Sequence, residues 1–238
     1  MGATACEAVT GDPALALVAA VDPHAAGREQ SGLTIGDTVE SLAGCDVVVD
    51  FSVAAAARQT LPWLAAHGIH AVVGTTGLTA DDVDALRGAF TASNCLIASN
   101  FAISAVLMMR FAEAAAPYFD TAEIIQLHHD RKVDAPSGTA ITTAQRMAAA
   151  SGEWAADPTE HELYAGARGS AGPGGIRVHA VRMRGMVAHQ EVILGAAGQT
   201  LTIRQDSYDR SSYMPGVLLA CKRIGDHPGV TEGLDTFL

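Results

Sequence analysis

The first hundred residues alternate short β-type runs with helix-type segments, and this order constrains the fold more than any other feature of the chain. A helix between two strands carries the chain back across the sheet, so that the two strands pair in parallel. The run Val47-Val48-Val49 is continuously β-branched, which is typical of a strand covered on both faces. The first part of the chain is therefore predicted to be an α/β domain with a parallel sheet wrapped by helices.

Turn residues divide this part of the chain into individual elements. We expect a helix over residues 53–67, with Ser52 as its N-cap and Pro62 as its weakest point, and a second helix from about residue 80. The expected strands cover residues 15–21 (ending at Asp22), 46–51, 70–73 and 96–98.

Beyond Phe101 the helical and extended segments no longer alternate. A mobile glycine-rich loop is expected over residues 165–175. The expected helices cover residues 103–116, 139–150 and 215–223, the last returning to the first domain. The expected strands cover residues 122–127, 176–183, 187–194 and 200–206. Turns separate the last three runs, and polar and apolar residues alternate in the final one. This predicts a mostly antiparallel open sheet with one face covered, for which a second subunit is a candidate cover.

The composition limits the classes of partner. The chain has 238 residues, 49% of them apolar and 17% charged, which indicates a compact protein of one large or two modest domains, and we favour two. Its 15 basic and 26 acidic residues give a formal charge of −11, the wrong sign for a nucleic-acid-binding surface. An anionic substrate would therefore need a local positive pocket, for which Arg131, Lys132 and Arg204 are the candidates.

The cysteines do not indicate a metal site. Cys6, Cys45, Cys95 and Cys221 are scattered, form no Cys-x-x-Cys pair and have no histidine at zinc-ligand spacing, so we expect reduced thiols. The longest apolar stretch near the start, residues 14–21, is too short to span a bilayer and follows no basic region. We expect a cytoplasmic protein that contains no metal.

The densest group of chemically capable side chains lies between a predicted strand and a predicted helix. It reads His128-His129-Asp130-Arg131-Lys132-Val133-Asp134-Ala135-Pro136-Ser137-Gly138-Thr139-Ala140. Pro136, Ser137 and Gly138 leave the first backbone N–H groups of the helix free, which makes a ready site for a carboxylate. Lys132 adds an ammonium that can pair with an anion and give a proton. The two histidines point to opposite sides if the strand geometry persists, and so would have different roles.

Each part of this run also has a purely structural explanation. A Pro-Ser-Gly-Thr sequence before a helix is usually a turn with a cap, and a histidine pair at a strand end is more often structural than functional. A zinc site would lack a third ligand at suitable spacing. Two histidines, a lysine and a helix start nevertheless occur together after a dinucleotide-type α/β domain, and this combination favours a binding site.

Taken with four other segments, this part of the chain resembles the 4-hydroxy-tetrahydrodipicolinate reductase family, also called the dihydrodipicolinate reductases, and is similar to its actinobacterial members. The likeness covers essentially the whole chain, and the run from Glu123 to Ala140 is its most specific part. The other segments are Val48-Val49-Asp50-Phe51-Ser52, Val73-Gly74-Thr75-Thr76-Gly77, Ala98-Ser99-Asn100-Phe101 and Leu201-Thr202-Ile203-Arg204-Gln205-Asp206-Ser207.

The resemblance implies the domain organisation, cofactor and partners. It implies a Rossmann-like dinucleotide-binding domain over residues 1–101 and 211–238, and an α+β substrate-binding and oligomerisation domain over residues 102–210. It further implies NADH or NADPH as cofactor, a small dicarboxylate as substrate and a homotetramer.

The resemblance also implies individual roles. His128 matches the acid/base histidine of the family and Lys132 its proton donor. The positions that match substrate-binding residues, or adjoin them, are His129, Ser137, Gly138 and Thr139. The positions that match cofactor-binding segments are Met1, Asp22, Gly74, Thr75, Thr76, Ala98, Ser99, Asn100 and Phe101. Asp22 would take the adenosine ribose hydroxyls, although its structural alternative is a strand-end cap. An acid there favours NADH by charge, while the family uses both cofactors.

The implied reaction transfers a hydride from the reduced nicotinamide to C4 of the ring that forms when 4-hydroxy-tetrahydrodipicolinate loses water. Lys132 and the helix-start amides would hold the substrate carboxylates. Either His128 or Lys132 would then deliver a proton, and the spacing does not choose between them. The product would be tetrahydrodipicolinate, in the diaminopimelate and lysine pathway.

The start of the chain departs from the family pattern. The family opens with a strand and a GxxGxxG turn that receives the pyrophosphate, and Met1-Gly2-Ala3 matches only the tail of this turn. Roughly ten residues are therefore absent by comparison, about one strand and a tight loop. The absent strand would be central, so we expect exposed apolar edges on its neighbours. An incorrectly chosen start codon or a real truncation would explain the difference, and we favour the first.

Three other functions remain as hypotheses. One is a related dehydrogenase acting on another amino or imino dicarboxylate, because a Rossmann-like domain does not define the substrate. Another is a ligand-binding or assembly protein that has lost its cofactor. A metal hydrolase using His128 and His129 is the weakest of the three.

Overall fold

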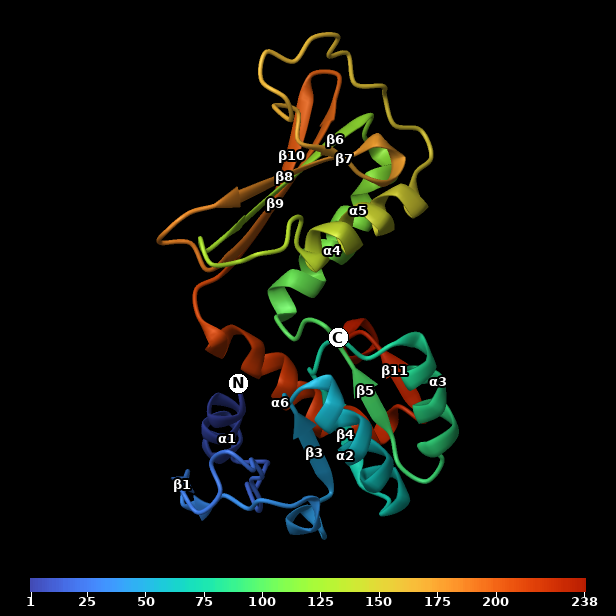
Figure 1. Ribbon diagram of the computed structural model, residues 1–238. Coiled ribbons are helices and arrows are strands. Elements are labelled where there is room, and N and C mark those ends of the chain that lie inside the picture. The colour runs from blue at the N-terminus through green and yellow to red at the C-terminus, as the bar shows by residue number, and fades with distance from the viewer. The chain divides into compact units, whose positions relative to one another are not determined.

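The protein, described here by a computed structural model of residues 1–238, divides into two compact units (Figure 1). The first unit consists of Met1–Ile103 and Arg210–Leu238, and the second of Ser104–Asp209. None of the helices is long and apolar enough to cross a membrane.

The first unit contains the predicted parallel sheet. It has four strands in the order β11-β5-β4-β3, all of them parallel to their neighbours. The strands are β3 (Val47–Asp50), β4 (His70–Val73), β5 (Cys95–Ile97) and β11 (Val230–Glu232). The helices are α1 (Gly2–Gly11), α2 (Ala54–Ala66), α3 (Ala80–Ala89) and α6 (Met214–Arg223). The predicted return of the last long helix to this unit is confirmed.

Local sequence explains how these elements form. Leu61 and Leu64 of α2 are fully buried against the sheet, in a core that also contains Ile69 and Phe90. Helix α3 begins with a capping box, in which Thr79 and Asp82 satisfy each other's backbone N–H groups. Helix α2 continues through Pro62.

Three expectations for the first unit are wrong in detail. Residues 15–21 form no strand, because no strand of the sheet pairs with them and only an isolated bridge joins Val21 to Gly36. Ser52 does not cap α2, since its hydroxyl donates to the carboxylate of Asp50 and Val53 takes the N-cap position. The three valines of β3 are half-buried rather than buried, because β3 is an outer strand of the sheet.

Several elements of the first unit have no counterpart in the sequence-based expectations. They are helix α1, strand β11 and the two-residue strands β1 (Glu29–Gln30) and β2 (Leu33–Thr34), which pair with each other in antiparallel fashion.

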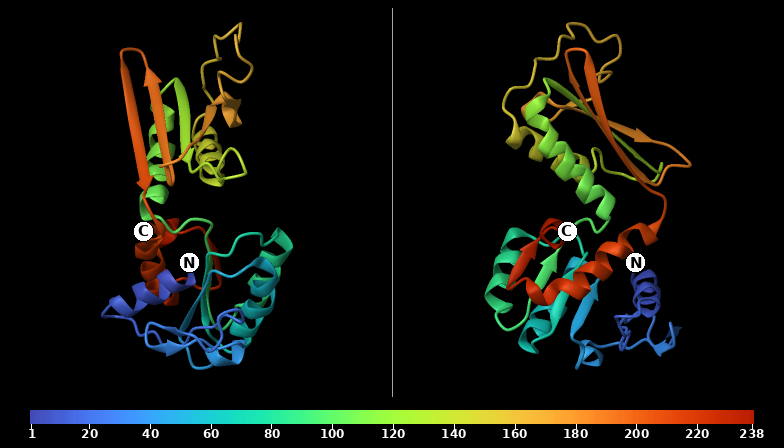
Figure 2. Two further views of the ribbon diagram at one scale, coloured as in Figure 1. Left: turned by 60° about the vertical axis from the view of Figure 1, so that its left-hand side comes forward. Right: turned by 180° about the vertical axis from the view of Figure 1, so that it is seen from behind.

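The second unit is built on a five-stranded sheet in the order β10-β9-β6-β8-β7. Its strands are β6 (Thr121–His128), β7 (Ser170–Ala171), β8 (Arg177–Arg182), β9 (Ala188–Ala196) and β10 (Gln199–Ser207). Two helices, α4 (Ile103–Ala115) and α5 (Gly138–Ala150), lie against one face of the sheet (Figure 2). The predicted mostly antiparallel sheet with one covered face is therefore confirmed.

The order of strands adds a detail that the sequence did not predict. The three late runs were expected in a mostly antiparallel sheet, and the structure places β6 between β8 and β9, where it pairs with both. Its pairing with β8 is parallel, and its pairing with β9 is antiparallel. Within the glycine-rich segment 165–175, β7 pairs with β8, so this stretch is not entirely irregular.

Candidate functional site

The predicted substrate segment joins the end of β6 to the start of α5. His128 is the last residue of β6, and in the sheet it lies opposite Arg182 of β8 on one side and Ala188 of β9 on the other. Helix α5 begins at Gly138, and the buried Ser137 is its N-cap, whose hydroxyl accepts the N–H of Ala140 at 3.2 Å. A central strand therefore presents the histidines, and a capped helix start ends the loop that follows them.

An ion pair within this loop holds Lys132. Its ammonium donates to both carboxylate oxygens of Asp134, each at 2.8 Å. The pair lowers the pKa of Asp134 below its usual value, chiefly through the hydrogen bond from Lys132. The loop thus supplies both a cation suited to a substrate carboxylate and an internal carboxylate that engages this cation.

Arg182 fastens the same loop to the sheet, and sequence reasoning did not identify it. One of its terminal nitrogens donates to the carbonyl oxygen of Asp134 at 2.7 Å. The other donates to Gln126 Oε1 at 3.0 Å and to the carbonyl oxygen of Val181 at 2.8 Å. Its position follows from the register of β8 against β6, for which no local pattern gives a signal.

Four buried polar atoms in this region have no hydrogen-bond partner within the protein. They are Gln126 Nε2, His128 Nδ1, His129 Nδ1 and Arg182 Nε. Buried polar atoms are nearly always satisfied in folded proteins, by protein groups, water or a ligand. A concentration of unpaired atoms at one strand end is therefore the pattern of a site that binds polar molecules.

His128 has a strongly perturbed acidity. Its pKa is lowered to about 4, first by burial, which disfavours the imidazolium, and then by the nearby positive charges of Lys132 and Arg182. The imidazole is therefore neutral near pH 7, and can accept a proton or a hydrogen bond there.

The expected contribution of Arg204 to a positive pocket is wrong. Arg204 lies on β10, where its guanidinium is paired with Glu191 and Asp206. Two carboxylates compensate this charge. Beside His128, Lys132 is paired with one carboxylate, that of Asp134, and the terminal nitrogens of Arg182 donate to uncharged oxygens.

The structure also brings together two of the predicted cofactor segments, at the carboxyl ends of neighbouring strands in the first unit. Gly74, Thr75 and Thr76 follow β4, and Ala98 to Phe101 follow β5. The rings of Phe51 and Phe101 meet edge to face at a centroid distance of 5.9 Å. Ligands of open α/β sheets bind at this edge.

Two details show how this edge is shaped. A Cβ atom on Gly74 would lie 2.1 Å from the Phe51 ring, so only glycine allows the backbone to pass there. The side chain of Asn100 accepts the N–H of Ala102 at 2.9 Å, which turns the chain after β5. The residues present are compatible with a nicotinamide dinucleotide, because they leave main chain and small side chains at the strand ends.

The other two predicted cofactor residues lie on separate segments of the first unit. Asp22 follows the isolated Val21–Gly36 bridge, and its carboxylate accepts the N–H of His24 at 2.9 Å. Met1 is the N-cap of α1 and makes no side-chain capping bond. The first N–H groups of a helix are favourable to an anion such as a pyrophosphate.

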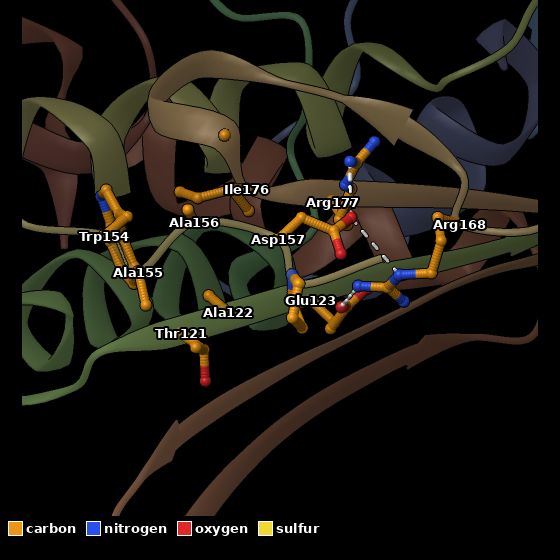
Figure 3. A pocket seen from close by; sticks show the side chains of 12 residues that line it. Thr121, Ala122, Glu123, Trp154, Ala155, Ala156, Asp157, Arg168, Ile176 and Arg177 are labelled. Carbon is orange, nitrogen blue, oxygen red and sulfur yellow. Dashed lines mark hydrogen bonds and ion pairs between the residues drawn. The ribbon is translucent and has the colours of Figure 1, made fainter. Parts of the chain in front are cut away.

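A small cavity in the second unit involves none of the predicted site residues (Figure 3). Its volume is about 60 Å³, and four charged side chains line it: Glu123, Asp157, Arg168 and Arg177. Glu123 binds Arg168 and also His179 Nε2, each at 2.5 Å. Asp157 binds Arg177 at 2.5 Å and Arg168 at 3.5 Å. These charges compensate one another, which indicates a structural network rather than a substrate site. No three His, Cys, Asp or Glu side chains are placed to hold a metal ion.

The comparisons with known proteins cover the whole chain. Residues 1–101 match the family model "Dihydrodipicolinate reductase, N-terminus", and residues 104–238 match "Dihydrodipicolinate reductase, C-terminus". A 4-hydroxy-tetrahydrodipicolinate reductase of Corynebacterium aurimucosum is 50% identical over 245 residues, covering 100% of this chain and 94% of that protein. The reductase of Nocardia farcinica is 50% identical over 247 residues, with the same coverage.

A solved structure supports the same assignment. The dipicolinate-bound dihydrodipicolinate reductase from Paenisporosarcina sp. TG-14 has a TM-score of 0.89 and 34% identity, and the match covers 99% of this chain and 94% of that one. A more distant likeness, to GenD2 of gentamicin A biosynthesis at 14% identity and a TM-score of 0.62, reflects the fold alone. The chain belongs to the dihydrodipicolinate reductase family.

Proposed function

We propose that this chain carries out the reaction of its family through the segment between β6 and α5. That reaction is the NADH- or NADPH-dependent reduction of 4-hydroxy-tetrahydrodipicolinate to tetrahydrodipicolinate, a step of diaminopimelate and lysine biosynthesis. One observation carries the proposal. Lys132, Arg182 and two histidines with unpaired buried nitrogens lie together in the segment that leads to a capped helix start.

The two units would divide the work. Residues 1–101 and 211–238 would form the dinucleotide-binding domain, with the strand ends at Gly74–Thr76 and Ala98–Phe101 next to the cofactor. Residues 102–210 would bind the substrate and form the contacts between subunits. The parallel four-stranded sheet of the first unit, with loops at its carboxyl edge, and the mostly antiparallel sheet of the second support this division.

Two groups of donors would hold the substrate carboxylates. The ammonium of Lys132 would bind one of them, and the start of α5 at Ser137, Gly138 and Thr139 would bind the other. His129 would donate or accept a hydrogen bond through its unpaired buried nitrogen. A ligand with two carboxylates uses both groups, which is why this arrangement favours a dicarboxylate.

Proton delivery would fall to Lys132. The reduced nicotinamide supplies the hydride when it is bound. Hydride transfer leaves an electron-rich product that must take up one proton. His128 is neutral above about pH 4 and so holds no imidazolium proton near neutrality, whereas the lysine ammonium does. His128 would then orient the substrate and accept a hydrogen bond beside the reacting atoms.

A coupled assay tests the proposal directly. The preceding synthase supplies the unstable substrate, and loss of reduced-nicotinamide absorbance reports turnover. Lys132→Ala should lower turnover about 100-fold or more, the typical scale for loss of a general acid. Lys222→Ala is the matched control, because Lys222 also pairs with an aspartate, Asp12, but lies on α6 of the other unit. Equal activity of both variants would contradict the assigned role.

Two finer features belong to the same proposal. We propose a homotetramer, for which the sheet face not covered by α4 and α5 is the candidate contact, and a cytoplasmic location. Light scattering of the purified protein tests the first, since a monomeric mass contradicts it. The matched relatives give no support to a related dehydrogenase of other specificity or to a cofactor-deficient binding protein.

A further inference from the structure

We infer that Asp134 is a positioning residue that occupies Lys132 in the absence of ligand and gives way when a substrate carboxylate arrives. This inference rests on the proposed role of Lys132 as a substrate-binding residue. In the absence of ligand, the carboxylate of Asp134 would bind Lys132 in place of a substrate carboxylate.

The geometry of the pair supports an exchange of this kind. The Lys132 ammonium lies 2.8 Å from both oxygens of Asp134, as it would from a bound carboxylate. The Lys132 side chain is 22% exposed, but that of Asp134 is 59% exposed. The aspartate therefore occupies the solvent side of the pair and can rotate into water without losing buried contacts.

Arg182 confines the movement to the Asp134 side chain. It holds the carbonyl oxygen of this residue at 2.7 Å and is itself anchored on Gln126, which is fully buried in β6. The carboxylate of Asp134 accepts hydrogen bonds from Lys132 and none from Arg182, whose positive charge acts on it only through space. Release of the carboxylate thus leaves the main chain of the loop where it is.

The charges around the lysine explain why an internal partner is useful. Lys132 and Arg182 both act on His128, and their positive charges help to lower its pKa. Without a ligand, the Asp134 carboxylate offsets this positive charge. With a ligand, one carboxylate replaces another, so the ammonium stays paired throughout. The consequence is competition, in which every ligand that uses Lys132 must displace Asp134.

Competition predicts that removing the charge of Asp134 strengthens binding. Asp134→Asn keeps the size of the side chain but ends the ion pair. Asp130→Asn is the matched control, because Asp130 lies in the same loop, loses the same charge and pairs with Arg184 instead of Lys132. The probe is pyridine-2,6-dicarboxylate, titrated by calorimetry with NADH present, and thermal unfolding checks that each variant is folded.

We expect the Kd of the probe to fall about fivefold in Asp134→Asn, the upper range for a partly exposed ion pair, and to stay unchanged in Asp130→Asn. The KM of the substrate should fall in parallel. A Kd that is unchanged or raised in Asp134→Asn overturns the inference, because it would show that Asp134 is indifferent or supports binding. An equal fall in both variants also overturns it, since general charge would then be the cause.

The same titration separates this inference from the proposed function. If the probe binds to the unaltered protein and Asp134→Asn does not strengthen this binding, only the exchange is contradicted. Absence of probe binding to the unaltered protein and to both variants contradicts both the exchange and the dicarboxylate site.

Discussion

Thr75 donates a 2.6 Å hydrogen bond to the buried carboxylate of Asp50, and thereby ties together the ends of two neighbouring parallel strands. The same carboxylate oxygen accepts the backbone N–H of Ser52 at 2.8 Å and its hydroxyl at 2.7 Å. Asp50 is not itself one of the predicted cofactor-binding positions. Asp50 organises the loops after β3 and β4, and the second of these loops contains the predicted cofactor positions Gly74 to Thr76.

Asp50→Ala should weaken cofactor binding through these loops. Three donors lose their acceptor, which should lower the free energy of unfolding by about 1–3 kcal/mol. The Kd of NADH, followed by nicotinamide fluorescence, should rise about tenfold because Thr75 is no longer held. Asp46→Ala is the control, since this exposed aspartate lies before the opposite end of β3. If the Kd of NADH is unchanged in Asp50→Ala, the loops hold their shape without the carboxylate.

Gly74→Ala should disturb the aromatic contact at the same edge. The added Cβ would lie 2.1 Å from the Phe51 ring, and that ring packs on Phe101. Relief requires a shift of Phe51 or of the β4 end, at a cost of about 1–3 kcal/mol by analogy with overpacked cores. Gly88→Ala in α3 is the matched control, because nothing lies within 4 Å of its Cβ position and alanine favours a helix. Chemical denaturation should therefore show a lower midpoint for Gly74→Ala and a higher midpoint for Gly88→Ala than for the unaltered protein. Equal midpoints would contradict the steric argument.

His128 should make the second unit less stable in mild acid. Its pKa in the folded protein is about 4, below the ordinary value of 6.5, so the unfolded chain takes up the proton first as the pH falls. Above pH 6.5 the imidazole is neutral in both states, and this histidine does not lower the free energy of unfolding. As the pH falls from 6.5 towards 4, protonation favours the unfolded chain, and the free energy of unfolding decreases progressively. His128→Gln should flatten the decline of Tm over this window, whereas His161→Gln, at an exposed position of the same unit, should leave it unchanged. A decline of the same slope in all three proteins would count against the lowered pKa.

Local sequence patterns account for the elements that were predicted correctly. The β-branched run of β3, the capped start of α5 and the glycines between elements are signals carried by neighbouring residues, and each element formed where these signals occur. The candidate substrate segment stands out in the sequence for the same reason, because its histidines, lysine and helix start lie within one short stretch of chain.

The features that were missed depend on pairing between distant segments. Residues 15–21 have the composition of a strand, but a strand also needs a partner and the sheet provides none. The parallel pairing of β8 with β6 is equally invisible in either segment alone. It also decides the role of Arg182, since only the register places this residue opposite His128 and within reach of Asp134. Strand β11 has only three residues, too few for a pattern.

The ion network around Glu123 should hold residues 154–168 against the sheet (Figure 3). Partial burial alone would raise the pKa of Glu123, but the hydrogen bonds from Arg168 and His179 lower it overall. The stability that Glu123 contributes is therefore present above its ordinary pKa of 4.5 and is lost as the pH falls through its lower pKa in the folded protein. Glu123→Ala leaves both partners without this acceptor, and should lower the free energy of unfolding by about 1–3 kcal/mol at pH 7.

In the same variant, hydrogen exchange should become faster in residues 154–168 while α4 keeps its protection. Glu160→Ala, an exposed change within the same loop, is the control and should leave the exchange unaltered. If exchange in the loop is the same in Glu123→Ala as in the unaltered protein, other contacts of the loop hold it in place.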